Sequence, residues 1–234
     1  KENASYILRI LCICNFPCLM LKYFKIIISK HYSSKHTKFK TIKPERGKKM
    51  IDCHVHSNFS TDGKMHTDTA CQAAIDLGLA GIAFTDHFDI NYPYPDFVFK
   101  FDLDEYFENI ERIKYKYKDK IKVLAGIEMG LMPDTIDENL QIIRQNNFDY
   151  VLASVHVVDG MDPYMMDYYN DKTKQEAYER YLEEVHKIIT LINDFDMFAH
   201  LDYVIRPAGY SDRTLSYCDH SDIFDSIFKE LISR

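Results

Sequence analysis

From residue 50 onward the chain alternates short apolar segments with longer amphipathic ones. The short segments have the length and pattern of strands and lie at 51–55, 81–85, 121–127, 150–155 and 197–201. In the longer segments apolar side chains recur every three or four residues, which predicts helices at 67–77, 103–113, 134–146, 174–192 and 221–232. Strands that alternate with helices in this way predict a parallel α/β architecture.

The first predicted strand carries two histidines on one face. Its apolar residues Ile51, Cys53 and Val55 alternate with polar ones, and successive side chains of a strand point to opposite faces. His54 and His56 are therefore expected to point in the same direction. A lone histidine is more often a hydrogen-bonded residue than a metal ligand, so the pair alone does not establish a site.

Each later predicted strand also delivers a ligand-type side chain at or near its carboxyl end: His87, Glu128, His156 and His200. In closed barrels of alternating strands and helices the catalytic groups collect at this end, so we expect these residues and the first pair to converge on one rim. Imidazole and carboxylate ligands suit zinc, iron or manganese. The series therefore predicts a catalytic cluster of divalent metal ions.

The remaining histidines and one loop aspartate need separate treatment. Asp62, in the loop 57–64, can fold back toward the rim and add a carboxylate, but His66 lies nearby and competes for that position. The residues alone leave this choice open. Four histidines follow no predicted strand and are interpreted as ordinary polar residues: His31, His36, His186 and His220.

Composition narrows the possible partners. The 234 residues are 46% hydrophobic and 28% charged, as expected for one large globular domain. A net charge of -7 argues against a general nucleic-acid surface and is compatible with a small charged substrate. The six cysteines lack the spacing of a zinc ribbon or a disulfide framework, which favours a reducing cytoplasm. We expect no nucleic-acid or membrane partner.

Residues 1–49 differ in kind from the rest. A signal peptide would need small residues at a cleavage site, and Tyr23 and Phe24 do not provide them. A transmembrane helix would need about 20 largely uncharged residues, and the apolar run is interrupted by Pro17, Lys22 and Lys25. Purine-rich codons for residues 46–49 followed by a methionine would match a translated ribosome-binding site and start codon. We therefore expect 1–49 to be a non-native or disordered extension, with the functional domain at 50–234.

Several short sequence motifs resemble those of the PHP superfamily of phosphoesterases, and more narrowly those of its histidinol-phosphatase branch. The motifs are His54-Val55-His56-Ser57, Phe84-Thr85-Asp86-His87-Phe88-Asp89, Gly126-Ile127-Glu128, Ser154-Val155-His156-Val157-Val158-Asp159-Gly160 and His200-Leu201-Asp202. The predicted helical segment 176–185 also resembles the branch. The resemblance implies a distorted (β/α)7 barrel that binds up to three divalent ions at its carboxyl rim. It also implies the ligands His54, His56, Asp62, His87, Glu128, His156 and His200, with Glu128 bridging two metals.

The family pattern continues with a later Asp-x-His, which does not occur before Arg234. We therefore expect the barrel to be incomplete at its C-terminus, with incomplete metal binding and weak or no activity in this chain.

The same resemblance implies L-histidinol phosphate as the substrate and a role in histidine biosynthesis. Glu128 and His156 are the expected catalytic residues. Arg206 follows His200 by six residues, and its planar guanidinium suits phosphate binding. Loop carboxylates and tyrosines could bind the amine and the imidazole of such a substrate, and the sequence does not choose among Asp89, Asp159, Asp162, Tyr92, Tyr94, Tyr164 and Tyr168.

Other functions remain open at this point. A protein-tyrosine phosphatase or a generic phosphomonoesterase would use the same ligands. A nuclease or polymerase-associated module fits less well, because the acidic chain offers no nucleic-acid track. A non-catalytic metal-binding module is also less favoured, since structural zinc sites are four-coordinate and closed, whereas this ligand set is larger and spread over many loops.

Overall fold

The computed structural model describes residues 50–234, so the expectations for 1–49 and for His31 and His36 lie outside the described residues. The strands are β1 (Ile51–Val55), β2 (Gly81–Phe84), β3 (His87–Asp89), β4 (Lys122–Gly130), β5 (Tyr150–Ser154) and β6 (Met197–Phe198). The α-helices are α1 (Thr67–Asp76), α2 (Leu103–Tyr117), α3 (Ile136–Gln145), α4 (Lys174–Leu191) and α5 (Ser221–Ile232). Short 3-10 turns follow at Pro133–Thr135, Met166–Tyr169, Tyr203–Ile205 and Tyr217–Asp219.

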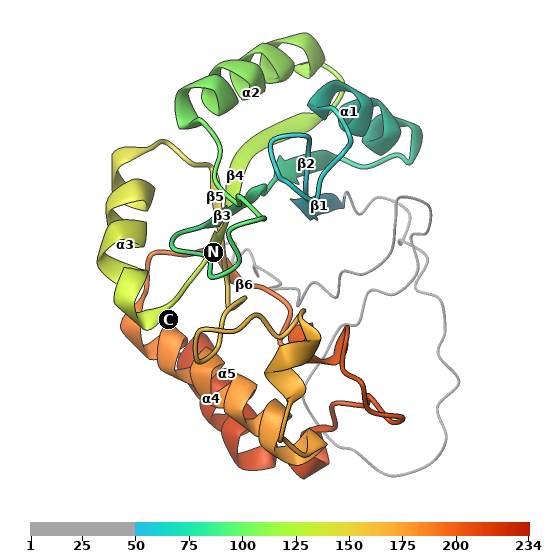
Figure 1. The fold of residues 1–234 in the computed structure, drawn as a ribbon. Coiled ribbons are helices and arrows are strands. Elements are labelled where there is room, and N and C mark those ends of the chain that lie inside the picture. Colours follow the sequence, from blue (N-terminus) through green and yellow to red (C-terminus); the bar gives the residue numbers. More distant parts are fainter. Residues whose placement is uncertain (1–49) are drawn as a thin grey trace.

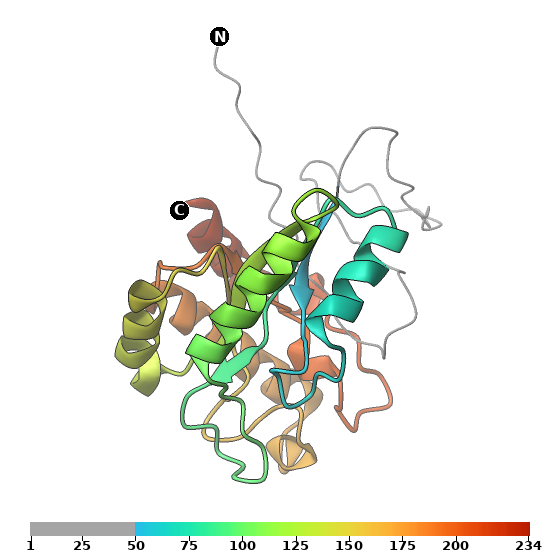
Figure 2. The same ribbon diagram turned by 90° about the horizontal axis from the view of Figure 1, so that it is seen from above.

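The strands form one curled, wholly parallel sheet in the order β1-β2-β4-β5-β6 (Figure 1). The long strand β4 changes partner along its length: its first half pairs with β2 and its second half with the short strand β3. Because all strands run in one direction, the loops that follow them gather at one end of the sheet (Figure 2). The predicted parallel α/β architecture is confirmed, and the sheet has the curvature of a half-barrel.

Two hydrophobic clusters hold the helices against the outside of the sheet. One lies between β2, the first half of β4 and the helices α1 and α2, which contact each other and lie side by side in Figure 2. The other lies between β4, β5, β6 and the helices α4 and α5, which pack on each other. Both clusters contain the periodic apolar positions that predict these helices, so burial of one helix face explains where each helix lies.

Tyr106 ties α2 to the sheet where β4 changes partner. Its ring is fully buried in the first cluster. Its hydroxyl donates to the carbonyl oxygens of Phe84, 3.0 Å away, and Gly126, 2.7 Å away. Phe84 is the last residue of β2 and Gly126 lies in the middle of β4. The single phenol proton is therefore shared between two backbone acceptors at an interruption of the strand ladder.

The strand boundaries differ from the prediction in three places. β3 was not predicted, because three residues are too few to show a period. β4 extends to Gly130, so Glu128 lies inside the strand and not after it. β6 contains only Met197 and Phe198, and His200 follows it. Backbone pairing, which the apolar pattern does not encode, sets these ends.

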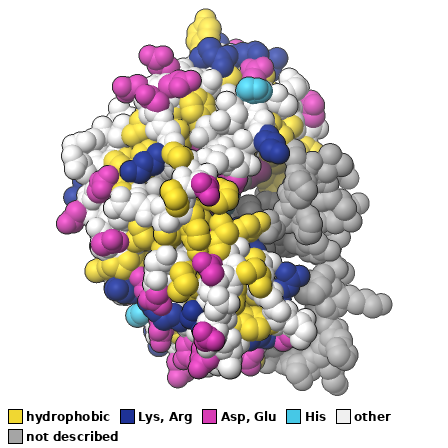
Figure 3. All heavy atoms as spheres, in the orientation of Figure 1, with side chains coloured by type: hydrophobic (Ala, Val, Ile, Leu, Met, Phe, Trp, Pro, Cys, Tyr) yellow, Lys and Arg dark blue, Asp and Glu magenta, His cyan; other side chains and the backbone are white. Residues whose placement is uncertain are grey.

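Polar and apolar surfaces are distributed unevenly. Figure 3 shows apolar side chains gathered in the middle of one face, between the α1–α2 end and the α4–α5 end, while charged groups cover the outer helices. Among the described residues, no helix is both long enough and apolar enough to cross a membrane.

Candidate metal centre

The carboxyl end of β1 supplies the first two imidazoles. His54 lies in β1 and His56 follows the strand directly. Their Nε2 atoms lie 3.0 Å apart, so both side chains point to the same place, as predicted. Two nitrogens that bind one zinc ion at about 2.0–2.1 Å are themselves separated by roughly 3 Å. The pair thus has the spacing of two ligands of a common ion.

Glu128 lies at the centre of the site. Its side chain is fully buried in β4. The Oε2 atom lies 3.0 Å from His54 Nε2 and 2.9 Å from His56 Nε2. The Oε1 atom lies 2.9 Å from His200 Nε2 and accepts a 2.5 Å hydrogen bond from the Ser154 hydroxyl. Each carboxylate oxygen therefore faces a different set of donors, as expected of a bridge between two ions.

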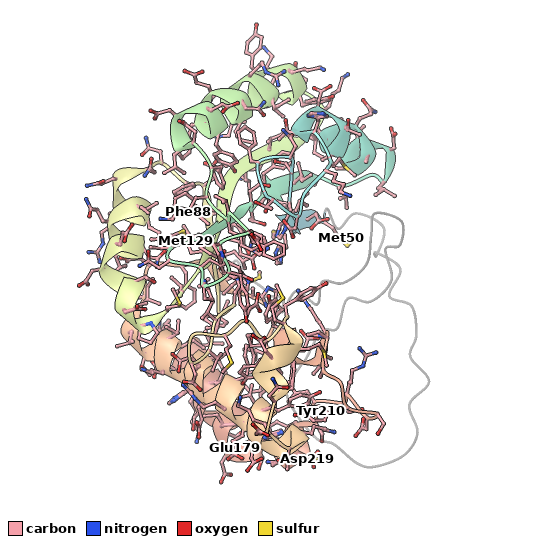
Figure 4. The ribbon with its side chains drawn as sticks, in the orientation of Figure 1. Met50, Phe88, Met129, Glu179, Tyr210 and Asp219 are labelled. Atoms are coloured by element: carbon pink, nitrogen blue, oxygen red, sulfur yellow. The ribbon has the colours of Figure 1, made fainter. Side chains whose placement is uncertain are left out.

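Strand alternation explains how β3 and β4 place their side chains. Phe88 and Met129 are register partners and point into the apolar core, where they lie close together (Figure 4). His87 and Glu128 are the preceding register partners and point to the opposite face. His87 Nδ1 lies 3.4 Å from Glu128 Oε2. The same pairing that builds the core therefore positions the polar site.

Asp62 occupies the exposed side of the site. Its Oδ2 atom lies 3.0 Å from His56 Nδ1 and 3.5 Å from His87 Nε2, and its Oδ1 atom accepts a 2.6 Å hydrogen bond from the Ser60 hydroxyl. Its side chain is 47% exposed. His66, the competing residue, is exposed at the start of α1 and belongs to none of the potential metal-binding groups. The geometry therefore favours Asp62.

His156 follows β5 and is held from behind by Asp89. The Nδ1 atom of His156 donates to Asp89 Oδ1 at 2.8 Å, and its Nε2 atom lies 3.4 Å from Glu128 Oε1. The sequence suggested Asp89 only as a possible contact for the substrate amine. A better signal was available, because Asp89 is two residues after His87 and so shares its face of a strand. That signal required β3 to be recognised.

Three groups of residues could each hold an ion. They are His54, Glu128 and His200; His56, Asp62 and His87; and His87, Asp89 and His156. All seven ligands suggested by the sequence lie in these groups, whereas among the described residues His186 and His220 do not. The buried nitrogens His87 Nδ1 and His156 Nε2 have no hydrogen-bond partner although carboxylate oxygens lie near them. This donor set of imidazoles and carboxylates fits divalent metal ions.

Burial and neighbouring charges shift the pKa values of the site in opposite directions. Burial disfavours the charged form of Glu128, but the surrounding imidazoles lower its pKa well below the usual range. Burial also disfavours the charged form of His56, but Asp62 and Glu128 have the larger effect and raise its pKa to about 10. At His200 burial prevails and lowers the pKa to about 3. The buried carboxylates therefore hold protons on some imidazoles and not on others.

Metal binding is expected to release protons at pH 7. The pKa of His56 is about 10, and nearby carboxylates also raise the pKa of His87 and His156 despite burial. His56 is therefore protonated at pH 7, and only the neutral form of an imidazole binds a metal. Calorimetric titration with Zn²⁺ in buffers of different ionisation enthalpy measures the release, which should fall as the pH approaches 10. Binding at pH 7 without proton release would contradict this prediction.

A buried hydrogen-bond pair holds the loop after β1 in place. Asp86 accepts hydrogen bonds from the Ser57 amide at 2.5 Å and the Ser57 hydroxyl at 2.8 Å. Ser57 directly follows His56, and Asp86 directly precedes His87. The contact thus fixes the spacing between two strand ends that carry candidate ligands.

Arg206 lies beside the metal centre. Its guanidinium is 4.9 Å from the centre of the Tyr203 ring, and that ring stacks on His200 at 5.1 Å. One of its terminal nitrogens is buried without a hydrogen-bond partner. Its positive charge also contributes, after burial, to the lowered pKa of His200.

The other proposed substrate contacts separate into different environments. Asp159 is bound by Arg180 through two hydrogen bonds, and Tyr168 is buried in the core with its hydroxyl donating to Ala177. The Tyr168 hydroxyl is therefore not available to a ligand, and the charge of Asp159 is paired with Arg180. Asp162 is buried and accepts from the hydroxyls of Tyr92 and Tyr203.

Comparison with known proteins agrees with this geometry. Residues 52–234 match the family model described as PHP domain. A histidinol-phosphatase of Lactococcus lactis subsp. lactis is 35% identical over 187 residues, which are 80% of this chain and 69% of that protein. A Clostridium acetobutylicum protein named "Probable histidinol-phosphatase" is 36% identical over 185 residues, or 79% and 70% of the two chains.

A solved structure shares the fold. The crystal structure of histidinol phosphate phosphatase from Lactococcus lactis, complexed with zinc, L-histidinol and phosphate, superposes with a TM-score of 0.76 at 35% identity. The match covers 79% of this chain and 70% of that one. The half-barrel, the imidazoles at its rim and the buried Glu128 agree with these matches, and the chain belongs to the PHP domain family, in the histidinol-phosphatase branch.

Proposed function

We propose that this protein is a metal-dependent phosphomonoester hydrolase that converts L-histidinol phosphate and water to L-histidinol and phosphate in histidine biosynthesis. The observation that carries this proposal is the convergence of five histidines, Glu128 and Asp62 at one rim of the sheet, in a chain 35% identical to a protein crystallised with zinc, L-histidinol and phosphate.

The proposed ligands are His54, His56, Asp62, His87, Glu128, His156 and His200. They lie in three groups, of which the second and third share His87 and the third also contains Asp89. They would hold up to three divalent ions, of zinc, iron or manganese. When bound, such ions supply positive charge to phosphate oxygens and lower the pKa of water to near neutrality. The rest of the chemistry falls to the residues of the chain.

Glu128 and His156 are the proposed catalytic residues. Glu128 is buried with one carboxylate oxygen 3.0 Å from His54 and the other 2.9 Å from His200, so its negative charge would help to hold the cations that bind the phosphate. His156 presents Nε2 toward that centre while Asp89 holds Nδ1. Both side chains are buried, which limits the access of water to them and strengthens their electrostatic effect.

Arg206 is the proposed phosphate-binding residue. Its buried nitrogen without a partner offers a donor beside His200, and Tyr203 supports the guanidinium from one side. A planar guanidinium can bind two phosphate oxygens at once. A cytoplasmic location and the lack of nucleic-acid or membrane partners stay predictions from the sequence.

A substrate panel tests the proposal. The chain loaded with Zn²⁺ or Mn²⁺ is assayed with histidinol phosphate, phosphotyrosine and a nucleotide monophosphate, and we expect a kcat/KM for histidinol phosphate higher by about a hundredfold. Because the sequence predicts weak turnover, the ranking decides, and binding of L-histidinol by calorimetry provides a second measurement. Comparable rates on all three substrates would contradict the narrow assignment. So would undetectable turnover of every substrate together with no binding of L-histidinol.

A further inference from the structure

Asp89 is a buried carboxylate to which the proposed mechanism assigns no contact with substrate. Its Oδ1 atom accepts the hydrogen bond from His156 Nδ1 at 2.8 Å. His156 Nε2, on the other side of the ring, is buried without a hydrogen-bond partner and lies 3.4 Å from Glu128 Oε1. One nitrogen of this imidazole is thus occupied and the other is directed at the metal centre.

Gly130 lies directly against this carboxylate. Asp89 and Gly130 are register partners in the β3–β4 pair. A Cβ atom at Gly130 would lie 1.9 Å from Asp89 Oδ1 and 2.3 Å from its Cγ. Non-bonded atoms do not approach this closely, so the Asp89 side chain would have to move. The backbone of Gly130 is ordinary strand, so backbone conformation does not require glycine there. The required property is the absence of a side chain.

The two strands therefore repeat one arrangement at successive positions on the same face. His87 pairs with Glu128, and two residues later Asp89 pairs with Gly130. The first pair supplies ligand atoms. The second pair supplies a carboxylate and the space for it, directly behind the third imidazole.

We propose that Asp89 is a positioning residue that fixes the tautomer and the ring orientation of His156, and that Gly130 is specifically required to leave room for the Asp89 carboxylate. A histidine whose Nδ1–H donates to a carboxylate offers only Nε2 to an ion, and such a partner also makes that nitrogen more basic. The inference rests on the metal centre of the proposed function but not on the identity of the substrate.

Zinc affinity of four variants tests the orientation. Affinity is measured by competition with a chromophoric chelator, and Asp89→Ala is expected to weaken Zn²⁺ binding by about 10–100-fold. Asp89→Asn should lose less, because the amide oxygen can still accept from Nδ1. Gly130→Ala should resemble Asp89→Ala, since the added methyl group displaces the carboxylate. The control is Gly81→Ala at the start of β2, where the added methyl group would crowd Ile51 of β1 and Lys122 of β4. It should leave zinc affinity unchanged.

A double-mutant cycle isolates the steric link. If Gly130 serves only to accommodate Asp89, adding Gly130→Ala to Asp89→Ala should change zinc affinity by less than about twofold, because the crowded carboxylate is already gone. Losses that multiply would overturn the role given to Gly130. Wild-type affinity in Asp89→Ala would overturn the orientation of His156.

Two further measurements separate positioning from folding and from direct ligation. Far-ultraviolet circular dichroism with excess chelator establishes that each variant is folded, and Asp89→Asn carries the test if an alanine variant is not. At saturating Co²⁺, a shifted visible spectrum with an unchanged number of bound ions supports positioning. Loss of one whole ion in both Asp89 variants would show that Asp89 is itself a ligand and overturn the proposal. A wild-type chain that binds zinc but does not hydrolyse histidinol phosphate would contradict only the proposed function.

Discussion

Replacing Glu128 by glutamine is expected to reduce metal affinity by more than about 100-fold, beyond the loss typical of a residue that only supports a ligand. The reason is geometric: both carboxylate oxygens of Glu128 face imidazoles, at 2.9–3.0 Å. An amide keeps the shape but offers one oxygen and an NH₂ group that cannot bind a cation. The effect is measured by the metal content after dialysis and, separately, by the turnover rate, and both should fall together.

Glu183→Gln is the matched control, because Glu183 is an exposed carboxylate on α4 and should retain full metal content. The metal-free form of Glu128→Gln should stay folded, since removing the buried charge also lets the neighbouring imidazoles release their protons. A variant that loses its fold together with its metal would support a purely structural metal site. A variant that keeps wild-type metal content would refute the bridging role.

Tyr106→Ala is expected to destabilise the protein by about 3–5 kcal/mol, the usual cost of deleting a large buried ring. The substitution would leave a cavity in the cluster between α2 and the sheet and would remove the donor to Phe84 and Gly126. For a domain of this size the melting temperature should fall by roughly 10 °C. Thermal or urea unfolding of the metal-free protein measures the change.

Tyr106→Phe separates the two contributions. It keeps the ring and removes only the hydroxyl, so a loss of about 1–3 kcal/mol is expected from two buried carbonyls without their donor. The exposed Tyr115 on the same helix provides the control, and Tyr115→Ala should change stability little. Equal losses at Tyr106 and Tyr115 would contradict the role of Tyr106 at the partner change of β4.

Apolar periodicity was sufficient to predict the α/β class and most elements, because burial of one face imposes a period on the sequence. The helix at 221–232 is observed as Ser221–Ile232, and the convergence of His54 with His56 followed from strand alternation. Periodicity could not predict β3, whose three residues pair with a strand more than thirty residues later in the chain. It also could not predict the two hydrogen bonds of Tyr106, which depend on a carbonyl from each of two strands.

The residues of the candidate site could be named from the sequence, but their arrangement could not. Which imidazole meets which oxygen of Glu128 depends on backbone register, and the choice of Asp62 over His66 depends on how the loop 57–64 folds. The role of Gly130 could be recognised only from its distance to Asp89. The expectations for 1–49 and for an incomplete barrel at the C-terminus stay predictions.

The dependence of β3 on β4 also has a kinetic meaning. Among the described strands, β3 pairs only with β4, and the segment between them includes the whole of α2. Contacts that close such long loops form late, because the entropy of closure must be overcome before they are gained. His87 and Asp89 should therefore become ordered only when the second half of β4 docks, so the chemistry of the rim would appear at the end of folding and not with the local chain that encodes it.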